Sequence, residues 1–406
     1  MSSHIRRSLL LRFVRYLLFV ALALSGGCGG KLYQVQPFDA SAIRDRAAVQ
    51  SENDLLVRAA IPDARESQII FGVPLYEQGV QAVWLEIENG TNSQLRYAPV
   101  GTDLEYFSPL EIAYKNRSGL SDEGRLAIDK RFYELAMPRY IAPGETASGF
   151  ILTHLHPGTK GFNVDLFGDQ KNVRFTFFVT APGFIPDHAE IDFAGLYDPD
   201  EIRRVEMDGL YDYLASQPIN STDAANEQTG SPLNTILIAK GEDILYALLR
   251  SGWRETARGD RSTVIGSGDY FFLDRRQDTI FRYEGSNADD GFYELRLWLS
   301  PAVVNDVPIW MGQMRHFVDH RWIDAVPDLD VDSAMWYMFQ KLWYSETLLK
   351  FGWIMSGEAA PIDEPHTDFQ GSTYFTSGIR VAMWLSGDPV SLQDIEFLDW
   401  DDPFNP

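Results

Sequence analysis

Cysteine is nearly absent from this sequence, which has one, Cys28, among 406 residues. A single cysteine excludes an intramolecular disulfide, so folding must depend on hydrophobic cores, for which 25 Phe, 18 Tyr and 10 Trp supply apolar area. Basic charge is also scarce, with 35 Lys and Arg against 58 Asp and Glu and a net charge of -23. This balance opposes nucleic-acid binding and gives no basic patch for anionic lipid headgroups, because both require clustered Lys and Arg.

Catalytic signatures are missing as well. The sequence contains no P-loop, no dinucleotide fingerprint and no HExxH motif. The turn Gly266-Ser267-Gly268 lacks the spacing of a nucleophile elbow. The sequence therefore predicts a location and an architecture more directly than it predicts a reaction.

The first 27 residues follow the plan of a secretory signal peptide. They hold four arginines and no acidic residue, followed by the apolar stretch Leu17–Leu24 and then small residues. A membrane span is the alternative, but it needs ~20 apolar residues, and the uninterrupted run here is about half that length. We expect residues 1–27 to be cleaved.

The residues around Cys28 resemble the lipobox of bacterial lipoproteins. Gly26, Gly27 and Cys28 match that motif, whereas Ser25 stands where Leu, Val or Ile is usual. The resemblance implies that the Cys28 thiol receives a diacylglycerol and that its new amine is acylated, for example with palmitate. Gly29 after the cysteine fits sorting to the outer membrane. We therefore expect a lipid-anchored protein of the bacterial cell envelope, with its domains in the periplasm or at the cell surface.

Composition and periodicity divide the remaining chain. Residues 28–52 read as a tether, and residues 53–190 contain several runs of alternating apolar residues, which predict an immunoglobulin-like antiparallel β-sandwich. A capped, acidic start predicts a helix over residues 198–215, and residues 217–232 are polar enough to form a linker; together they make up a connecting segment, 191–231.

Residues 232–390 predict a second, α+β (or α/β) domain, followed by an acidic tail at 391–406. A buried strand is expected at 235–239 and a helix at 242–251, where apolar residues recur at helical spacing. Four strand-like runs follow. The longest helix is expected at 331–351, and a last strand at 378–387.

Several segments of this second domain resemble the C-terminal domain of the LssY family, a bacterial envelope-associated group. In chain order they are PLNTILIAKGEDILYALLRSGW, RRQDTIFRY, LRLW, VPIWMGQ, DLDVD and YFTSGIRVA. The resemblance covers about 155 residues and implies the same domain fold here. The family often has histidines where this chain has Tyr293-Glu294 and Ala325-Val326, which puts a metal site built on them in doubt. Family members are often fused to a membrane phosphatase domain that this sequence lacks.

The densest group of metal-ligating residue types lies between residues 316 and 332. Imidazole suits zinc and crowded carboxylates suit calcium or magnesium, so these residues are candidate ligands of a divalent cation. They are His316, Asp319, His320, Asp324, Asp328, Asp330 and Asp332. The run from Asp328 is not an EF-hand loop, because Ser333 stands where glycine is needed. In the alternative interpretation, Asp328 and Asp330 are solvated loop carboxylates and Asp332 caps the following helix.

Two functions remain open at this point. The first is a non-enzymatic binding module that is held at the membrane by its N-terminal lipid, needs no cofactor and contacts a partner protein of the envelope. The second is a metal-assisted hydrolase that uses the segment from His316 to Asp332. An enzyme requires those side chains to converge in a concave pocket.

Overall fold

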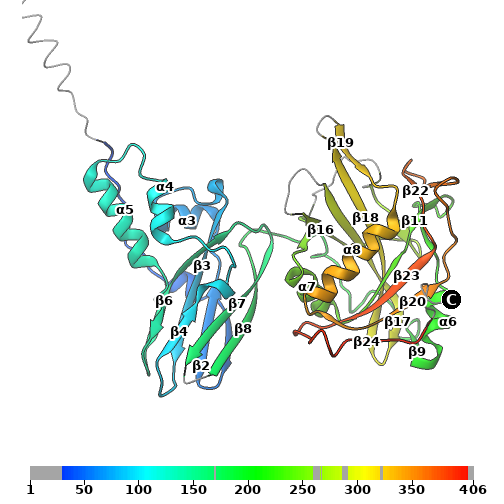
Figure 1. Ribbon diagram of the computed structural model, residues 1–406, viewed down its shortest axis with the longest axis horizontal. Helices are drawn as coiled ribbons and strands as arrows, with labels where there is room; N and C mark the ends of the chain where they lie inside the picture. Colours follow the sequence, from blue (N-terminus) through cyan, green and yellow to red (C-terminus); the bar gives the residue numbers. More distant parts are fainter. Residues whose placement is uncertain are drawn as a thin grey trace, which may run out of the picture. The chain divides into compact units, whose positions relative to one another are not determined.

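The computed structural model describes residues 30–168, 171–258, 266, 268–285, 291–320 and 323–400, with backbone alone at 171, 319, 320, 323 and 324 (Figure 1). The signal peptide and Cys28 lie outside the described residues. The chain divides into two compact units. Unit 1 runs to Leu155 and includes Asn163–Phe175, and unit 2 consists of His156–Phe162 and the chain from Thr176 onward.

Two four-stranded sheets make up most of unit 1, and the strands Thr159–Gly168 and Lys171–Thr180 of the second sheet each have residues in both units. The first is antiparallel and has the order β1 (Ala48–Glu52), β2 (Leu55–Ala60), β3 (Val80–Asn89) and β6 (Thr146–His154). The second has the order β5 (Tyr140–Ile141), β4 (Leu95–Ala98), β7 (Thr159–Gly168) and β8 (Lys171–Thr180). Nine of the ten residues of β3 are buried, so this strand contributes side chains to packing on both of its faces.

Helices in unit 1 pack against the first sheet. Asp63 and Glu66 form a capping box at the start of α3 (Ala64–Phe71), which explains why this short segment is helical. The aromatic side chains of Phe71, Phe132 and Phe150 meet in the core that these helices share with the sheet. The bounds are α2 (Ser41–Arg44), α3 (Ala64–Phe71), η1 (Tyr76–Gln78), η2 (Pro99–Gly101), α4 (Pro109–Lys115) and α5 (Asp122–Leu135).

Unit 2 is built on a ten-stranded sheet of order β13-β16-β17-β18-β12-β23-β20-β24, with β19 added to β18 and β9 to β17. Most pairs are antiparallel, but β12 with β23, β17 with β9 and β20 with β24 are parallel. The bounds are β9 (Arg203–Val205), β12 (Thr235–Ile238), β13 (Arg254–Glu255), β16 (Thr279–Glu284), β17 (Phe292–Val304), β18 (Val307–His320), β19 (Ile323–Pro327), β20 (Leu348–Met355), β23 (Ile379–Leu385) and β24 (Glu396–Phe397).

Different secondary-structure elements cover the two faces of this sheet. Helices α7 (Gly241–Arg250) and α8 (Val331–Tyr344) pack on one face, around Leu295, Leu297 and Met314. The other face packs against α6 (Leu210–Ala215), which follows η3 (Met207–Gly209), and against a smaller sheet. That sheet has the order β11 (Thr229–Pro232), β10 (Asn220–Thr222), β14 (Phe271–Phe272) and β15 (Arg275–Arg276). A separate pair consists of β21 (His366–Thr367) and β22 (Thr373–Tyr374).

These observations confirm a mixed α+β chain in which strands predominate. The strand expected at 235–239, the helix at 242–251 and the last strand at 378–387 all form. The four strand-like runs between them also form strands, of which β17 and β18 make a long hairpin. Its turn is Asn305-Asp306, with both φ angles positive, as a two-residue hairpin turn of this kind requires.

Five expectations were wrong. Residues 28–52 are not only a tether, because they contain α2 and β1, and β1 pairs with β2 in the first sheet. The acidic tail expected from residue 391 contributes β24, which pairs with β20. Residues 198–215 do not form one helix, because Arg203–Val205 pair with β17 as a parallel strand and only η3 and α6 are helical. The helix expected to reach residue 351 ends at Tyr344, where Glu346 adopts a left-handed conformation and the chain turns into β20. Residues 217–232 are not a linker, since they contribute β10 and β11 to unit 2.

Candidate functional site

The predicted cation ligands lie along β18, β19 and the start of α8. His316 is on β18, and its Nδ1 lies 3.1 Å from Oδ2 of Asp328. The backbone holds this pair together, because the amide of Asp328 donates to the carbonyl of His316 at 2.8 Å. The side chains of Asp319, His320 and Asp324 lie outside what the structure describes.

The remaining two carboxylates of this group make structural hydrogen bonds. Asp330 is the N-cap of α8 and accepts from the backbone N and the hydroxyl of Ser333 at 3.0 and 2.6 Å. Asp332, in the first turn, accepts from the Thr376 hydroxyl at 2.6 Å and from the backbone N and hydroxyl of Ser377 at 2.7 and 2.5 Å. The expected cap is therefore Asp330 rather than Asp332, and Asp332 joins α8 to the segment before β23.

Only His316 and Asp328 of the predicted ligands are thus paired with each other by their side chains within the described chain. No group of three or more His, Cys, Asp or Glu residues is arranged to hold a metal ion in the described part of the chain. Structural zinc sites use four ligands, and catalytic ones use three with an open position. The described side chains therefore do not by themselves make up a zinc site.

His316 belongs instead to an aromatic row that crosses three strands. Tyr283, Tyr293 and His316 are directly opposed on β16, β17 and β18. The Tyr293 ring stacks between His316 and Tyr337 of α8, at centroid separations of 4.3 and 4.1 Å. Lys341 Nζ donates to the Tyr283 hydroxyl at 3.1 Å. Burial raises the pKa of Tyr283, but hydrogen bonds with Tyr337 and Lys341 outweigh it and bring that pKa below its usual value.

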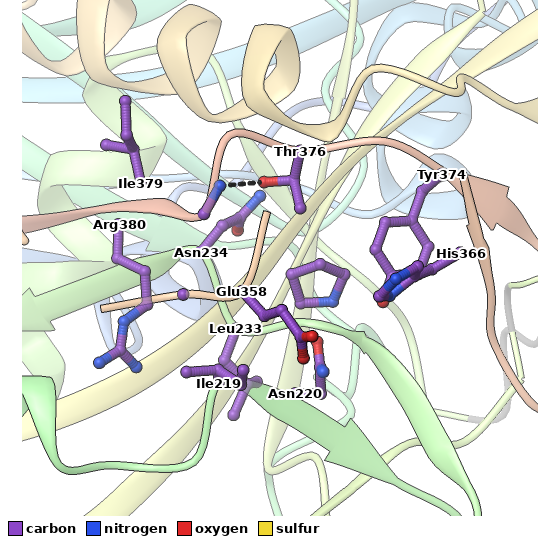
Figure 2. Close-up of a pocket in the computed structure, with 13 residues that line it drawn as sticks. Ile219, Asn220, Leu233, Asn234, Glu358, His366, Tyr374, Thr376, Ile379 and Arg380 are labelled. Atoms are coloured by element: carbon purple, nitrogen blue, oxygen red, sulfur yellow. Dashed lines mark hydrogen bonds between the residues drawn. The ribbon is translucent and has the colours of Figure 1, made fainter. Parts of the chain in front are cut away.

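A small cavity lies on the other face of the sheet, beside β10 and β23 (Figure 2). Its volume is about 20 Å³, which is room for roughly one water molecule. Arg380 lines it and donates to the Leu214 carbonyl and, at 2.8 Å, to the Ser356 hydroxyl. Burial lowers the pKa of Arg380 to about 10. This cavity is too small to be a ligand site.

A larger cleft of about 450 Å³ opens on the α7 face of the unit 2 sheet. Side chains of β16, β17 and β18 form its floor, and the first turn of α7 and the segment 188–194 form its walls. Apolar residues predominate in the lining: Phe193, Ala194, Ile244, Leu245, Phe281, Leu297, Leu299, Pro308 and Trp310. His188, Thr279 and Glu242 are its polar side chains. The volume and the lining are typical of small-molecule sites.

His188 is fixed at the cleft edge through its neighbour Asp187. The Asp187 carboxylate accepts from the hydroxyls of Thr256 and Thr279 at 2.6 and 2.8 Å, and from the backbone N of Ile280 at 2.8 Å. Its own amide donates to the Thr256 carbonyl at 3.1 Å. These bonds hold the segment against β13 and β16 and so determine the position of the imidazole.

The imidazole of His188 lies between two carboxylates. Its Nδ1 is 3.5 Å from Oδ1 of Asp187 and 3.3 Å from the Thr279 hydroxyl, and its Nε2 is 3.7 Å from Oε1 of Glu255. Only 2% of the Glu255 side chain is exposed, and its Oε2 has no hydrogen-bond partner within the described chain. The cleft therefore combines an apolar floor with one polar end.

No sequence pattern predicts this cleft. Its lining comes from five separate segments between residues 188 and 310, and neither Asp187 nor His188 belongs to a motif. An apolar residue that lines a cleft has the same sequence pattern as one in a core. We compared the sequence with models of known protein families and with characterised proteins and found no match.

Proposed function

We propose that this chain is a lipid-anchored protein of the bacterial envelope whose unit 2 is a non-enzymatic binding module. The apolar cleft beside His188 is the observation on which the binding role rests. Anchoring rests on the signal-like N-terminus and on the residues around Cys28. In the described part of the chain, no helix has the length and apolar character needed to cross a membrane.

The ligand that suits the cleft is an acyl chain or a similar elongated apolar molecule with one hydrogen-bonding group. Apolar side chains from three adjacent strands give a continuous floor, which favours a hydrocarbon because each buried methylene contributes ~0.8 kcal/mol. At the polar end, His188 presents an imidazole that can donate or accept a hydrogen bond. A partner protein in the envelope would deliver or receive this ligand.

The finer fold assignments belong to the same proposal. We assign unit 1 to the immunoglobulin-like sandwiches, with its two four-stranded sheets in support. We assign unit 2 to the LssY-type domain. Support for this comes from the segments quoted above, which resemble that family in the same order along about 155 residues.

Filling the cleft from Gly241 tests the binding role. Gly241 is the first residue of α7, and a Cβ there would lie 3.6 Å from the Trp310 ring, an ordinary contact. The Gly241→Phe ring would therefore occupy the cleft without straining the backbone. We expect the wild type to bind cis-parinaric acid, a fluorescent fatty acid, saturably, and Gly241→Phe to bind it at least 10-fold more weakly.

Gly209→Phe is the matched control. Gly209 has a φ of -99°, and a Cβ there meets no atom within 4 Å. This variant should bind like the wild type, and both variants should melt near the wild-type temperature. Equal affinity in Gly241→Phe and the wild type would contradict binding in the cleft.

Anchoring is tested separately with Cys28→Ala. Without the thiol no diacylglycerol is attached, so the protein should move from the membrane fraction to the soluble fraction. Cys28→Ala protein that still sediments with membranes and resists alkaline extraction would exclude a lipid anchor at this residue. Because this result does not depend on the cleft, the two parts of the proposal stand or fall independently.

A further inference from the structure

β17 and β18 carry polar side chains on the face of the sheet opposite α7 and α8. Glu294 is directly opposed to Arg315, and Arg296 to Gln313. Each of these four side chains is at most 1% exposed. Burying charge in a protein interior is costly unless each charged group is paired and hydrogen-bonded. Each of these buried side chains therefore needs hydrogen-bond partners for all of its polar groups.

Ion pairs connect the charged side chains of this face. Arg282 Nε donates to Oε2 of Glu294 at 2.9 Å, and Arg296 Nη2 lies 2.5 Å from Oε1 of the same carboxylate. Arg315 Nη1 lies 3.4 Å from Oδ2 of Asp368. These five residues are here called the arginine cluster.

Arg315 uses only one edge of its guanidinium group. Nη1 donates to the Ser231 hydroxyl at 2.6 Å, but Nε and Nη2 have no hydrogen-bond partner in the described chain, although both are buried. These two N–H groups form the parallel fork that binds two oxygens of one anion. The same fork holds a carboxylate at three other arginines of this chain: Arg44, Arg117 and Arg174.

Asp368 is not free to fill this fork. Its Oδ2 accepts from the hydroxyls of Ser231 and Tyr270 at 2.5 and 2.7 Å, and its Oδ1 accepts from the backbone N of Gln370 and Ser372 at 3.0 and 2.9 Å. A carboxylate has about four acceptor sites, and all of them are used. The fork of Arg315 therefore needs an acceptor from elsewhere.

Two further buried donors have no partner in the described chain: Nε of Arg296 and the hydroxyl of Ser372. Arg296 Nη2 donates to the Gly266 carbonyl at 3.2 Å, and the position of a Cβ on Gly266 would lie 2.2 Å from the Ser372 hydroxyl. Gly266 is therefore close to both residues that hold these donors. A side chain at position 266 would clash with the Ser372 hydroxyl.

We propose that the arginine cluster binds a small oxyanion, such as phosphate, sulfate or the carboxylate of a small acid. Two of its oxygens accept the fork of Arg315, and Arg296 Nε and the Ser372 hydroxyl supply further donors. The negative charge of the anion stabilises the buried guanidinium group of Arg315. Burial lowers the pKa of Arg315, and a bound anion opposes that effect by stabilising the charged form. The cleft lies on the opposite face of the sheet, so this second site does not depend on the proposed function.

The test measures the melting temperature of the full chain in detergent, with sodium phosphate, sulfate or acetate against sodium chloride at equal ionic strength. The unpartnered nitrogens have almost no exposed surface, so samples are incubated overnight to allow slow entry. A ligand at one hundred times its Kd should raise the melting temperature by roughly 5 to 10 °C. A rise with phosphate but not with glycerol 3-phosphate assigns the site to the free anion, and the reverse assigns it to a phosphate ester.

Two variants distinguish specific binding from general salt effects. Ser372→Ala removes a hydroxyl without a partner in the described chain, so this variant should fold normally. The phosphate concentration that gives half of the maximal rise in melting temperature, here called the phosphate midpoint, should be at least 5-fold higher than in the wild type. Arg315→Met should abolish the rise, whereas Arg204→Gln, at a side chain that is 74% exposed, should keep it. An unchanged melting temperature with all three anions and with glycerol 3-phosphate, and no heat of binding by calorimetry, would overturn the proposal. So would a midpoint unchanged in Ser372→Ala together with an undiminished rise in Arg315→Met.

Discussion

Replacing Asp332 with alanine separates the two interpretations of the acidic segment. If Asp332 is a ligand in a metal site, its removal matters only when the metal is bound. If it joins α8 to the segment before β23, its removal destabilises the protein even in the presence of a chelator. The three hydrogen bonds that its carboxylate accepts from Thr376 and Ser377 support the second role.

The size of the effect follows from these contacts. A hydrogen bond to a charged group contributes about 1.5 to 3 kcal/mol when buried. Thr376 is only 6% exposed, so its hydroxyl would be left buried without an acceptor. Ser377 is exposed, so its hydroxyl can form a hydrogen bond with water instead. Asp332 also lies in the first turn of α8, where a negative charge contributes about 0.3 to 1 kcal/mol. We expect Asp332→Ala to lower the free energy of unfolding by about 2 to 4 kcal/mol.

Thermal and urea unfolding in EDTA measure this loss. For a unit of this size, the expected change corresponds to a melting temperature roughly 5 to 10 °C lower. Asp388→Ala removes an exposed carboxylate on the loop after β23 and should stay within about 0.5 kcal/mol of the wild type. A wild-type melting temperature for Asp332→Ala in EDTA, with loss of stabilisation by zinc, manganese, magnesium or calcium, would refute the structural role and revive the hydrolase hypothesis.

Three other perturbations have defined outcomes. Burial lowers the pKa of His156 from 6.5 to about 4, so protonation of this residue favours the unfolded chain. The free energy of unfolding should therefore be highest above pH 6.5 and should fall by about 3 kcal/mol as the pH approaches 4. Urea unfolding at several pH values should show that His156→Gln removes this dependence. Gly149→Ala should cost about 1 to 3 kcal/mol in the same assay, because its Cβ would lie 2.6 Å from the backbone of Met137. His188→Gln should weaken binding of the fluorescent fatty acid several-fold but leave the melting temperature unchanged; equal affinity would exclude His188 from the ligand's polar end.

Local patterns predicted those elements of unit 2 whose stability is decided locally. α7 forms where apolar residues recur at helical spacing, and β12 and β23 form where short apolar runs are flanked by turns. The end of α8 was missed because the apolar residues of β20 continue the helical spacing by coincidence. The chain leaves the helix at Ser345 and Glu346, where a left-handed turn allows β20 to pair with β23.

Long-range partners explain the other failures. Residues 217–232 are polar, and polar composition predicts solvent exposure, but Ser221 and Ser231 are fully buried. Ser231 binds Arg315, which is 84 residues further along the chain. The carboxylates near α8 were recognised as a group, whereas the roles of Asp328 and Asp332 depend on His316 and on residues 376 and 377. No local signal carries that information.

The path of the chain through the two units restricts how this protein can be rearranged. The backbone leaves unit 1 after Leu155, returns at Asn163 and leaves again after Phe175. A single cut in the gene therefore never separates the two units cleanly, because the fragment that keeps all of one unit also carries a short segment of the other. The same holds for protein engineering: a fragment that starts at Thr176 lacks His156–Phe162, and one that starts at His156 also carries Asn163–Phe175 of unit 1.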